Sequence, residues 1–329
     1  MKRKILINKN IAEDAVQLLK KEYNVVQVES LNPQDPKLVQ ELKDTYGIIG
    51  SDIKITEELL NVAPLLKAVS TVSVGFDSLN VPELTKRGIL ATNTPDVLTE
   101  TTADAVFGLL LAAARRISEL DRYVKEGHWT NRIPESLFGV NVHGKTLGIT
   151  GMGRIGKAIA KRANKGFGMK IIYHNRSRDP EAEAAYDAEY SSLDGLLKKS
   201  DFVCAMTPLT PETYRMFGKE EFRAMKRSAV FVNGSRGSVV NEHALYEALK
   251  NKEIHAAGLD VFEKEPVDHD SPMLQLDNVI TLPHIGSATL ETRRAMAMLA
   301  AENILKSLAE EAPPNLLNPE AVGKAFGHP

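Results

Sequence analysis

The sequence predicts an α/β protein with parallel sheets, and two observations carry this prediction. Short apolar, β-branched runs alternate with helical stretches along almost the whole chain, as in parallel sheets whose strands are connected by helices. A glycine-rich turn at 151–156 (GMGRIG) lies between a strand-like and a helical run, and the preceding half has no such motif. We therefore expect a doubly wound Rossmann domain over 100–286, inserted into a flavodoxin-like α/β substrate-binding domain formed by 1–99 and 287–329.

The alternation also locates individual elements. Before residue 99 we expect strands at 4–8, 24–28, 47–50, 66–72 and 89–91, and helices that include 11–22 and 57–62. One long helical segment is expected from 99 to about 126, and a last helix over 289–310. In the Rossmann half we expect six strands, at 145–150, 169–174, 201–206, 229–233, 256–260 and 279–282.

The composition is that of an ordinary globular protein, with 43% hydrophobic residues, 26% charged residues and a net charge of −2. Because there is no basic excess, we expect no nucleic-acid partner. The longest apolar run, 105–114, is too short to span a membrane, and the chain start is too weakly apolar for a signal peptide. We expect a cytoplasmic protein with no membrane partner and no metal site. The one cysteine, Cys204, lies in an apolar run and is expected to be a buried, inert thiol.

The glycine turn meets three needs of a bound pyrophosphate. One glycine permits the tight turn, one lets the backbone approach the phosphates, and one lets the helix pack close to the strand. The N-terminus of the following helix offers unpaired N–H groups and a partial positive charge. A glycine turn that binds nothing is the weaker alternative, because a strand precedes this one and a helix follows it. We predict cofactor contacts from the whole turn, namely Gly151, Met152, Gly153, Arg154, Ile155 and Gly156.

The end of the next strand indicates which dinucleotide binds. A site that prefers NAD places Asp or Glu about 20 residues beyond the glycines, where it bonds the ribose 2′-OH. Here the first acidic residue after the glycine turn is Asp179, and two arginines flanking a serine come before it. These groups suit a 2′-phosphate, so NADP(H) is predicted over NAD(H), with a solvated basic turn as the alternative. The predicted contacts are Asn175, Arg176, Ser177 and Arg178.

Further candidates follow the later strands, because ligands of doubly wound sheets bind at the carboxyl ends of the strands. For the cofactor these are Thr207, Asp260 and Gly286, and for the chemistry Arg236, Glu265 and His284. Reduction of a ketone needs a proton, which His284 can supply near neutral pH. A free imidazole of pKa about 6.5 is only about a quarter protonated at pH 7, and a carboxylate such as Glu265 would raise that fraction. Arg236 would hold the carboxylate of an α-keto acid and polarise the ketone oxygen.

Each of these three residues also has a plainer interpretation. His284 could cap a helix, Arg236 could form a surface ion pair, and Glu265 could be an ordinary loop residue before a proline. Three such coincidences on one face of the sheet are improbable, so we favour a catalytic group.

Four strings carry a family resemblance: GMGRIGKAIAKRA, VNGSRGSVVNEHAL, AAGLDVFEKEP and LPHIGSAT. They resemble the D-isomer-specific 2-hydroxyacid dehydrogenases over essentially the whole chain, most of all the glyoxylate/hydroxypyruvate reductase type, which includes bacterial members that reduce 2-ketogluconate. The resemblance implies that Arg236, Glu265 and His284 are catalytic and that Asp260 faces the nicotinamide carboxamide. It also implies that the loop at Ser73, Val74 and Gly75 binds the substrate carboxylate through backbone N–H groups. A homodimer joined through the helix from Thr99 is expected, with a face buried inside the domain as the alternative.

Two departures from the family pattern bear on the substrate. Formate-type members carry glutamine where Glu265 stands, so formate oxidation is not expected. Animal reductases of this type carry a second tryptophan soon after the one matching Trp129, and here that place is Arg132, which favours a longer, hydroxyl-rich acid. The expected activity is NADPH-dependent reduction of small 2-keto acids such as glyoxylate and hydroxypyruvate. The alternatives are a 2-ketogluconate reductase and a dinucleotide-sensing binding protein of the same fold. A methyltransferase would leave Arg176 and Arg178 unexplained.

Overall fold

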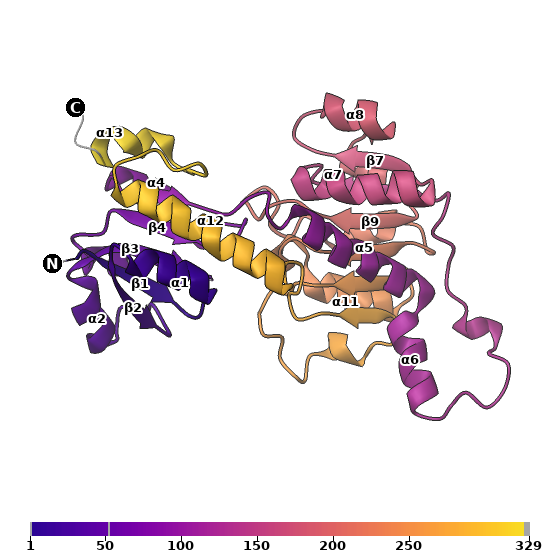
Figure 1. Ribbon diagram of the computed structural model, residues 1–329. Coiled ribbons are helices and arrows are strands. Elements are labelled where there is room, and N and C mark those ends of the chain that lie inside the picture. The colour runs from indigo at the N-terminus through magenta and orange to yellow at the C-terminus, as the bar shows by residue number, and fades with distance from the viewer. Residues whose placement is uncertain (1, 52, 326–329) are drawn as a thin grey trace. The chain divides into compact units, whose positions relative to one another are not determined.

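The computed structural model describes residues 2–51 and 53–325, and the chain divides into two compact units (Figure 1). Unit 1 consists of Met1–Leu98 and Thr289–Pro329, and unit 2 consists of Thr99–Ala288. Each unit contains its own parallel sheet flanked by helices. The predicted α/β class, with a Rossmann sheet and a flavodoxin-like sheet, is confirmed.

The sheet of unit 1 has five strands in the order β2-β1-β3-β4-β5, which is the flavodoxin order. The strands are β1 (Lys4–Asn8), β2 (Asn24–Val28), β3 (Thr45–Gly50), β4 (Ala68–Thr71) and β5 (Leu90–Thr92). The helices are α1 (Glu13–Lys20), α2 (Pro36–Leu42), α3 (Glu57–Asn61), α4 (Val81–Lys86), α12 (Leu290–Leu308) and α13 (Val322–Ala325). Polar caps start the three short helices of the first segment, because Asp35, Thr56 and Asn80 each accept a backbone N–H from the first turn.

Helices cover both faces of this sheet. The buried leucines of α2, α3 and α4 form one apolar core with alternate residues of the strands, among them Leu6, Ile48 and Val69. On the other face α12 packs against β3 and β4 beside α1 (Figure 1). Gly47 makes room for α12, because a Cβ at this position would lie 2.8 Å from Cδ1 of Ile304.

The sheet of unit 2 has seven strands in the order β12-β11-β10-β9-β6-β7-β8. They are β6 (Thr146–Thr150), β7 (Lys170–His174), β8 (Glu189–Tyr190), β9 (Phe202–Ala205), β10 (Val230–Asn233), β11 (Ala256–Leu259) and β12 (Val279–Thr281). The chain crosses over between β8 and β9, so the strand order reverses around β6, which carries the glycine turn at its carboxyl end. The expectation of six strands was wrong by one. The edge strand β8 has two residues, too few to give an alternating pattern.

Apolar cores lie on both faces of this second sheet. Its helices are α5 (Thr99–Arg115), α6 (Ile117–Lys125), α7 (Arg154–Lys161), α8 (Pro180–Tyr186), α9 (Leu193–Lys199), α10 (Lys219–Ala224) and α11 (Glu242–Lys250). One core joins α5 and α7 to the sheet, and the other joins α9, α10 and α11 to it. Alternate residues of a single strand enter different cores, as Cys204 and Val203 of β9 do. The expectation of a buried thiol at Cys204 is confirmed, and burial raises its pKa to about 12, which favours the unreactive protonated form.

The expected long helix from 99 to about 126 is two helices. The break is at Arg116, whose φ of 57° lies in the left-handed region. Its guanidinium forms two hydrogen bonds to the Glu119 carboxylate, at 2.7 and 2.6 Å, and also bonds the carbonyl of Ser136. The break therefore depends on tertiary contacts, because neither proline nor glycine marks it in the sequence. No helix in the described ranges is long and apolar enough to cross a membrane.

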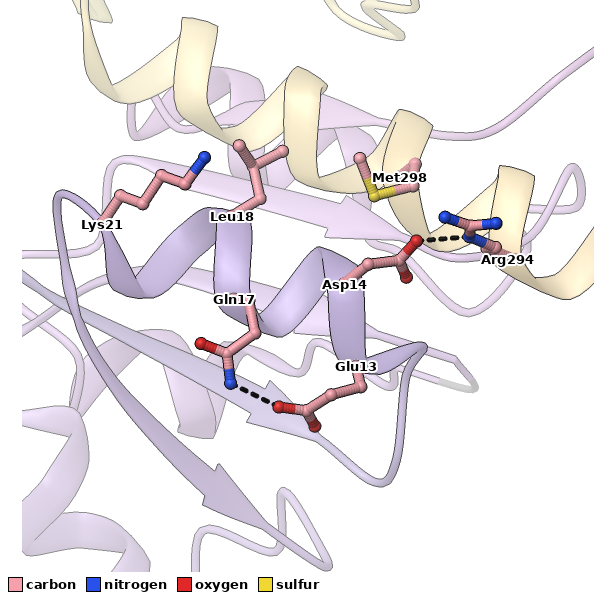
Figure 2. A pocket seen from close by; sticks show the side chains of 7 residues that line it. All are labelled: Glu13, Asp14, Gln17, Leu18, Lys21, Arg294 and Met298. Atoms are coloured by element: carbon pink, nitrogen blue, oxygen red, sulfur yellow. Dashed lines mark hydrogen bonds and ion pairs between the residues drawn. The ribbon is translucent and has the colours of Figure 1, made fainter.

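Unit 1 also has an open groove of about 640 Å³ between α1 and α12 (Figure 2). It is lined by Glu13, Asp14, Gln17, Leu18, Lys21, Arg294 and Met298. Asp14 and Arg294 form an ion pair that connects the two helices. The groove contains none of the site residues that the sequence predicts.

Candidate active site

The glycine turn at the end of β6 has the backbone geometry that its three glycines predict. Gly151 adopts a φ of 92°, and a Cβ there would lie 2.6 Å from the backbone of Met206. A Cβ on Gly156 would lie 2.3 Å from the carbonyl oxygen of Gly151, so this glycine allows α7 to start close to the turn. By contrast, a Cβ on Gly153 would meet nothing within 4 Å, which leaves open space in front of the turn. Arg154 and Ile155 begin α7 behind it.

The end of β7 and the residue after it are held against this turn. Oδ1 of Asn175 accepts the N–H of Met152 at 2.8 Å, and the carbonyl of His174 accepts the N–H of Gly151 at 3.0 Å. Thr207 follows β9 on the opposite side, and its buried hydroxyl oxygen has no hydrogen-bond partner among the described residues. An orphaned hydroxyl and an open face beside Gly153 both fit a bound dinucleotide phosphate.

The basic segment after β7 is exposed, and its two arginines differ in their contacts. Arg178 donates from Nε and Nη2 to the Glu183 carboxylate of α8 at 2.9 and 2.8 Å. Arg176 helps to lower the pKa of Glu212, after the larger effect of the hydrogen bond from Thr210. Asp179 is used as the N-cap of α8, where its Oδ1 accepts the N–H of Ala182 at 3.0 Å. The first acidic residue after the glycine turn is therefore engaged in capping.

His284 and Glu265 are brought into direct contact. Nδ1 of His284 lies 2.7 Å from Oε2 of Glu265, and this hydrogen bond raises the pKa of the imidazole above its usual range. Burial opposes ionisation of Glu265, but the hydrogen bonds from His284 and from the N–H of Phe262 outweigh it and lower the pKa of the carboxyl. The second ring nitrogen, Nε2, makes no hydrogen bond with the described residues. The imidazole can therefore carry a proton at Nε2 for another molecule.

Arg236 belongs to the same group through its charge, which helps to lower the pKa of Glu265 and opposes the rise in the pKa of His284. The loop that carries it is ordered by Asn233, the last residue of β10. The Asn233 side chain accepts from the N–H of Ser235 at 3.1 Å and donates to the carbonyl of Arg236 at 3.0 Å. Sequence reasoning missed Asn233, although its place at a strand end directly before the arginine loop is a usable signal.

Asp260 bonds the backbone of the loop that carries His284. It is 3% exposed, and its two carboxylate oxygens accept the N–H groups of Ile285 at 2.7 Å and Gly286 at 2.9 Å. Burial raises its pKa, and these two hydrogen bonds oppose the rise. His284 itself has a φ of 55°, a left-handed conformation that the adjacent bonds hold in place. The bonds to this loop are a role for Asp260 that the sequence did not indicate.

The predicted carboxylate-binding loop lies in unit 1, just after β4. The hydroxyl of Ser73 donates to the carbonyl of Gly75 at 2.6 Å, and Nδ2 of Asn93 donates to the carbonyl of Val74 at 2.8 Å. The N–H of Thr94 donates to the carbonyl of Ser73 at 2.9 Å. The carbonyls of this loop are thus bonded within the unit. Arg236, Glu265 and His284 are brought together within unit 2.

A reversing parallel sheet, a glycine turn and an Arg–Glu–His group at its carboxyl edge define the class of NAD(P)-binding oxidoreductases. The matches to known proteins specify the family. Residues 107–286 match the NAD binding domain of the D-isomer specific 2-hydroxyacid dehydrogenases. The chain belongs to this family.

Several relatives are similar over almost their whole length. The glyoxylate/hydroxypyruvate reductase B of Klebsiella pneumoniae is 48% identical over 97% of this chain and 99% of its own. The protein of the same name from Salmonella paratyphi C is 47% identical over 98% and 100%. Among solved structures, an NADPH-dependent glyoxylate/hydroxypyruvate reductase of Sinorhizobium meliloti, in complex with NADP and malonate, has a TM-score of 0.88, with 32% identity over 98% of both chains. The TT0316 protein of Thermus thermophilus has a TM-score of 0.86, with 40% identity over 95% of this chain and 99% of its own.

Proposed function

We propose that this protein reduces small 2-keto acids, such as glyoxylate and hydroxypyruvate, to 2-hydroxy acids with NADPH. The observation that carries the proposal is the 2.7 Å contact between His284 and Glu265, which lies with Arg236 at the carboxyl edge of the sheet that bears the glycine turn. The activity named for the Klebsiella and Salmonella relatives supports the same substrates.

A bound nicotinamide would supply the hydride at this site. The side chains of the protein would stabilise the developing charge and donate the proton. Glu265 engages Nδ1 of His284 and stabilises the imidazolium, so Nε2 holds the proton that the developing alkoxide takes. The Arg236 guanidinium binds the substrate carboxylate and polarises the ketone oxygen. For unit 1, we assign substrate-carboxylate binding to the N–H groups of Val74 and Gly75, next to Ser73.

The cofactor is proposed to bind unit 2 along the glycine turn and the residues that flank it. Gly151, Gly153 and Gly156 admit the pyrophosphate, while Thr207 and Asn175 border the turn. Arg176, Ser177 and Arg178 are assigned to the 2′-phosphate of NADPH, and Asp260 and Gly286 to the nicotinamide end. An NADP complex of the Sinorhizobium relative supports this preference.

We further propose a cytoplasmic homodimer. Side chains on α6 and in the segment that follows it are apolar and exposed, as at Ile117, Val124, Trp129 and Phe138. Apolar side chains gathered on one segment favour a protein partner. Arg132 lies in the same exposed segment and supports 2-ketogluconate as a second candidate substrate, because a guanidinium can bond the hydroxyls and carboxylate of a longer acid.

Turnover tests the proposal. The purified chain is incubated with NADPH and glyoxylate, hydroxypyruvate or 2-ketogluconate, and the loss of NADPH absorbance is followed. We expect steady-state turnover with at least one of these acids. Tight NADPH binding without turnover of any of them would instead identify a dinucleotide-sensing protein.

A further inference from the structure

Glu265 stands on a short segment between β11 and β12 that packs tightly against the Arg236 loop. A Cβ on Gly237 would lie 1.8 Å from the backbone carbon of Phe262, so the two backbones are in direct contact. Within the segment, Oε1 of Glu265 accepts the N–H of Phe262 at 3.0 Å, while Oε2 contacts His284. The direction of the Glu265 carboxylate therefore depends on the backbone path at residues 262–265.

A side chain from another element holds this path. Glu242 is the first residue of α11, and its Oε1 accepts the N–H of Glu263. The Glu263 carboxylate in turn faces Arg215, whose Nε lies 3.2 Å from Oε1. The backbone of Arg215 is itself anchored, because its main-chain N–H donates to the carbonyl of Ser238 at 2.8 Å. The backbone bond from Glu242 and this ion pair fix both the main chain and the side chain of Glu263, two residues before Glu265.

The charges around Glu242 indicate a functional arrangement. Its carboxylate is half-buried and lies near two others, those of Glu263 and Glu265. Burial raises the pKa of Glu242, the two neighbouring carboxylates raise it further, and the hydrogen bond from Glu263 opposes the rise. Placing the Glu242 carboxylate beside those of Glu263 and Glu265 is electrostatically unfavourable. This argues that the hydrogen bond from the Glu263 N–H to Glu242 is needed to hold the segment.

We propose that Glu242 is a positioning residue for the general acid: by accepting the N–H of Glu263 it holds the segment in the path that directs Glu265 at Nδ1 of His284. The inference rests on the proposed function, in which His284 donates the proton and Glu265 stabilises its charged form. Glu242 acts through Glu265 and is assigned no contact with substrate or cofactor.

A pair of nearly isosteric substitutions tests this role. Glu242→Gln keeps an oxygen that can accept the N–H of Glu263, and Glu242→Met keeps the length of the side chain but removes the acceptor. The full-length variants are labelled at histidine, and the His284 imidazole is titrated by NMR, with its signal assigned by its loss in His284→Gln. We expect Glu242→Met to lower the pKa of His284 by about half a unit or more, because the carboxylate that raises it is no longer held in place. Glu242→Gln should stay close to wild type.

Kinetics and a control on the same helix complete the experiment. In Glu242→Met, kcat should fall by about tenfold, its alkaline decline should move to lower pH, and KM for NADPH should not change. Glu247→Met is the matched control, because the Glu247 carboxylate of α11 bonds Asn251 and not the segment. An unchanged His284 pKa in Glu242→Met overturns the inference. So does an equal fall in Glu242→Gln or in Glu247→Met.

The NMR titration separates this inference from the proposed function. It needs no substrate, so it reports on Glu242 even if the wild type reduces no keto acid. A lowered His284 pKa in Glu242→Met, together with no turnover by the wild type, would refute the proposed reaction and support the positioning role. Turnover by the wild type with an unchanged His284 pKa in Glu242→Met would support the proposed reaction and refute the positioning role.

Discussion

At the scale of single residues, the site depends on two carboxylates near His284, one that contacts its ring and one that bonds the backbone of its loop. Glu265 bonds the ring at Nδ1, and Asp260 bonds the two backbone N–H groups that follow the histidine. The first carboxylate controls the charge of the imidazole, and the second controls where the imidazole lies. The two roles can be separated by substitution.

Glu265→Gln tests the control of charge. The folded-state pKa of His284 is raised chiefly by Glu265, so the protonated imidazole is fully present at lower pH and is lost as pH rises through the raised value. An amide in place of the carboxylate removes the charge that causes the rise. We expect the alkaline decline of kcat for keto acid reduction to move to lower pH, as measured in a pH series at saturating substrate. A profile that coincides with the wild type would mean that Glu265 only orients the ring.

Asp260→Asn tests the control of position. One carboxylate oxygen becomes an NH₂ group that faces a backbone N–H, so a buried donor loses its acceptor, at a cost of about 1–3 kcal/mol. We expect the melting temperature to fall by roughly 2–10 °C, and kcat to fall with it. Asp277→Asn is the control, because that side chain is 80% exposed. A melting temperature equal to that of the wild type would show that the two bonds contribute nothing to the fold.

At the scale of elements, the parallel strands were predictable and their interruptions were not. Runs such as 229–233 are apolar on both faces, which marks a buried parallel strand, and β10 lies within that range at Val230–Asn233. Arg116, at the helix break, bonds Glu119 and the carbonyl of Ser136, and Arg178 pairs with Glu183 of the following helix, contacts that hydrophobic periodicity does not reveal. The same reasoning applies to the site. A local pattern can place Arg236, Glu265 and His284 at one edge of the sheet, but it cannot reveal that Glu242 bonds the segment that carries Glu265.

The segment between β7 and α8 yields a prediction about cofactor preference. Two prongs of the Arg178 guanidinium already bond Glu183, whereas Arg176 forms no hydrogen bond or ion pair with the described residues. Arg176 should therefore contribute more to binding a 2′-phosphate. We expect Arg176→Ala to reduce the ratio of kcat/KM for NADPH to that for NADH by about tenfold or more, and Arg178→Ala to reduce it less. The opposite order, or equal use of both cofactors by the wild type, would contradict this assignment.

At the scale of the whole molecule, each unit has its own core, and α6 with the segment after it leaves apolar side chains exposed. Phe138 is 50% exposed and Trp129 is 63% exposed, which is costly in water unless a second chain covers them. Light scattering on the purified chain should therefore give a mass near twice 36.1 kDa. Ile117→Asp and Val124→Asp together should shift it toward the monomer. A wild-type mass of 36.1 kDa at micromolar concentration would contradict the proposed dimer.

The central claim is that the Arg–Glu–His group reduces a ketone whose neighbouring carboxylate is held by Arg236. The most direct measurement compares kcat/KM for hydroxypyruvate with that for its uncharged analogue, using NADPH and the wild type, Arg236→Lys and Arg236→Ala. Two charge-assisted hydrogen bonds from the guanidinium to the substrate carboxylate contribute about 1.5–3 kcal/mol each, so the wild type should prefer the acid by a factor of roughly 100 or more. Arg236→Lys should be severely impaired because it lacks the two-pronged geometry, and Arg236→Ala should bind NADPH but lose activity on the acid. Equal reduction of both ketones by the wild type would contradict the account and would identify a general carbonyl reductase.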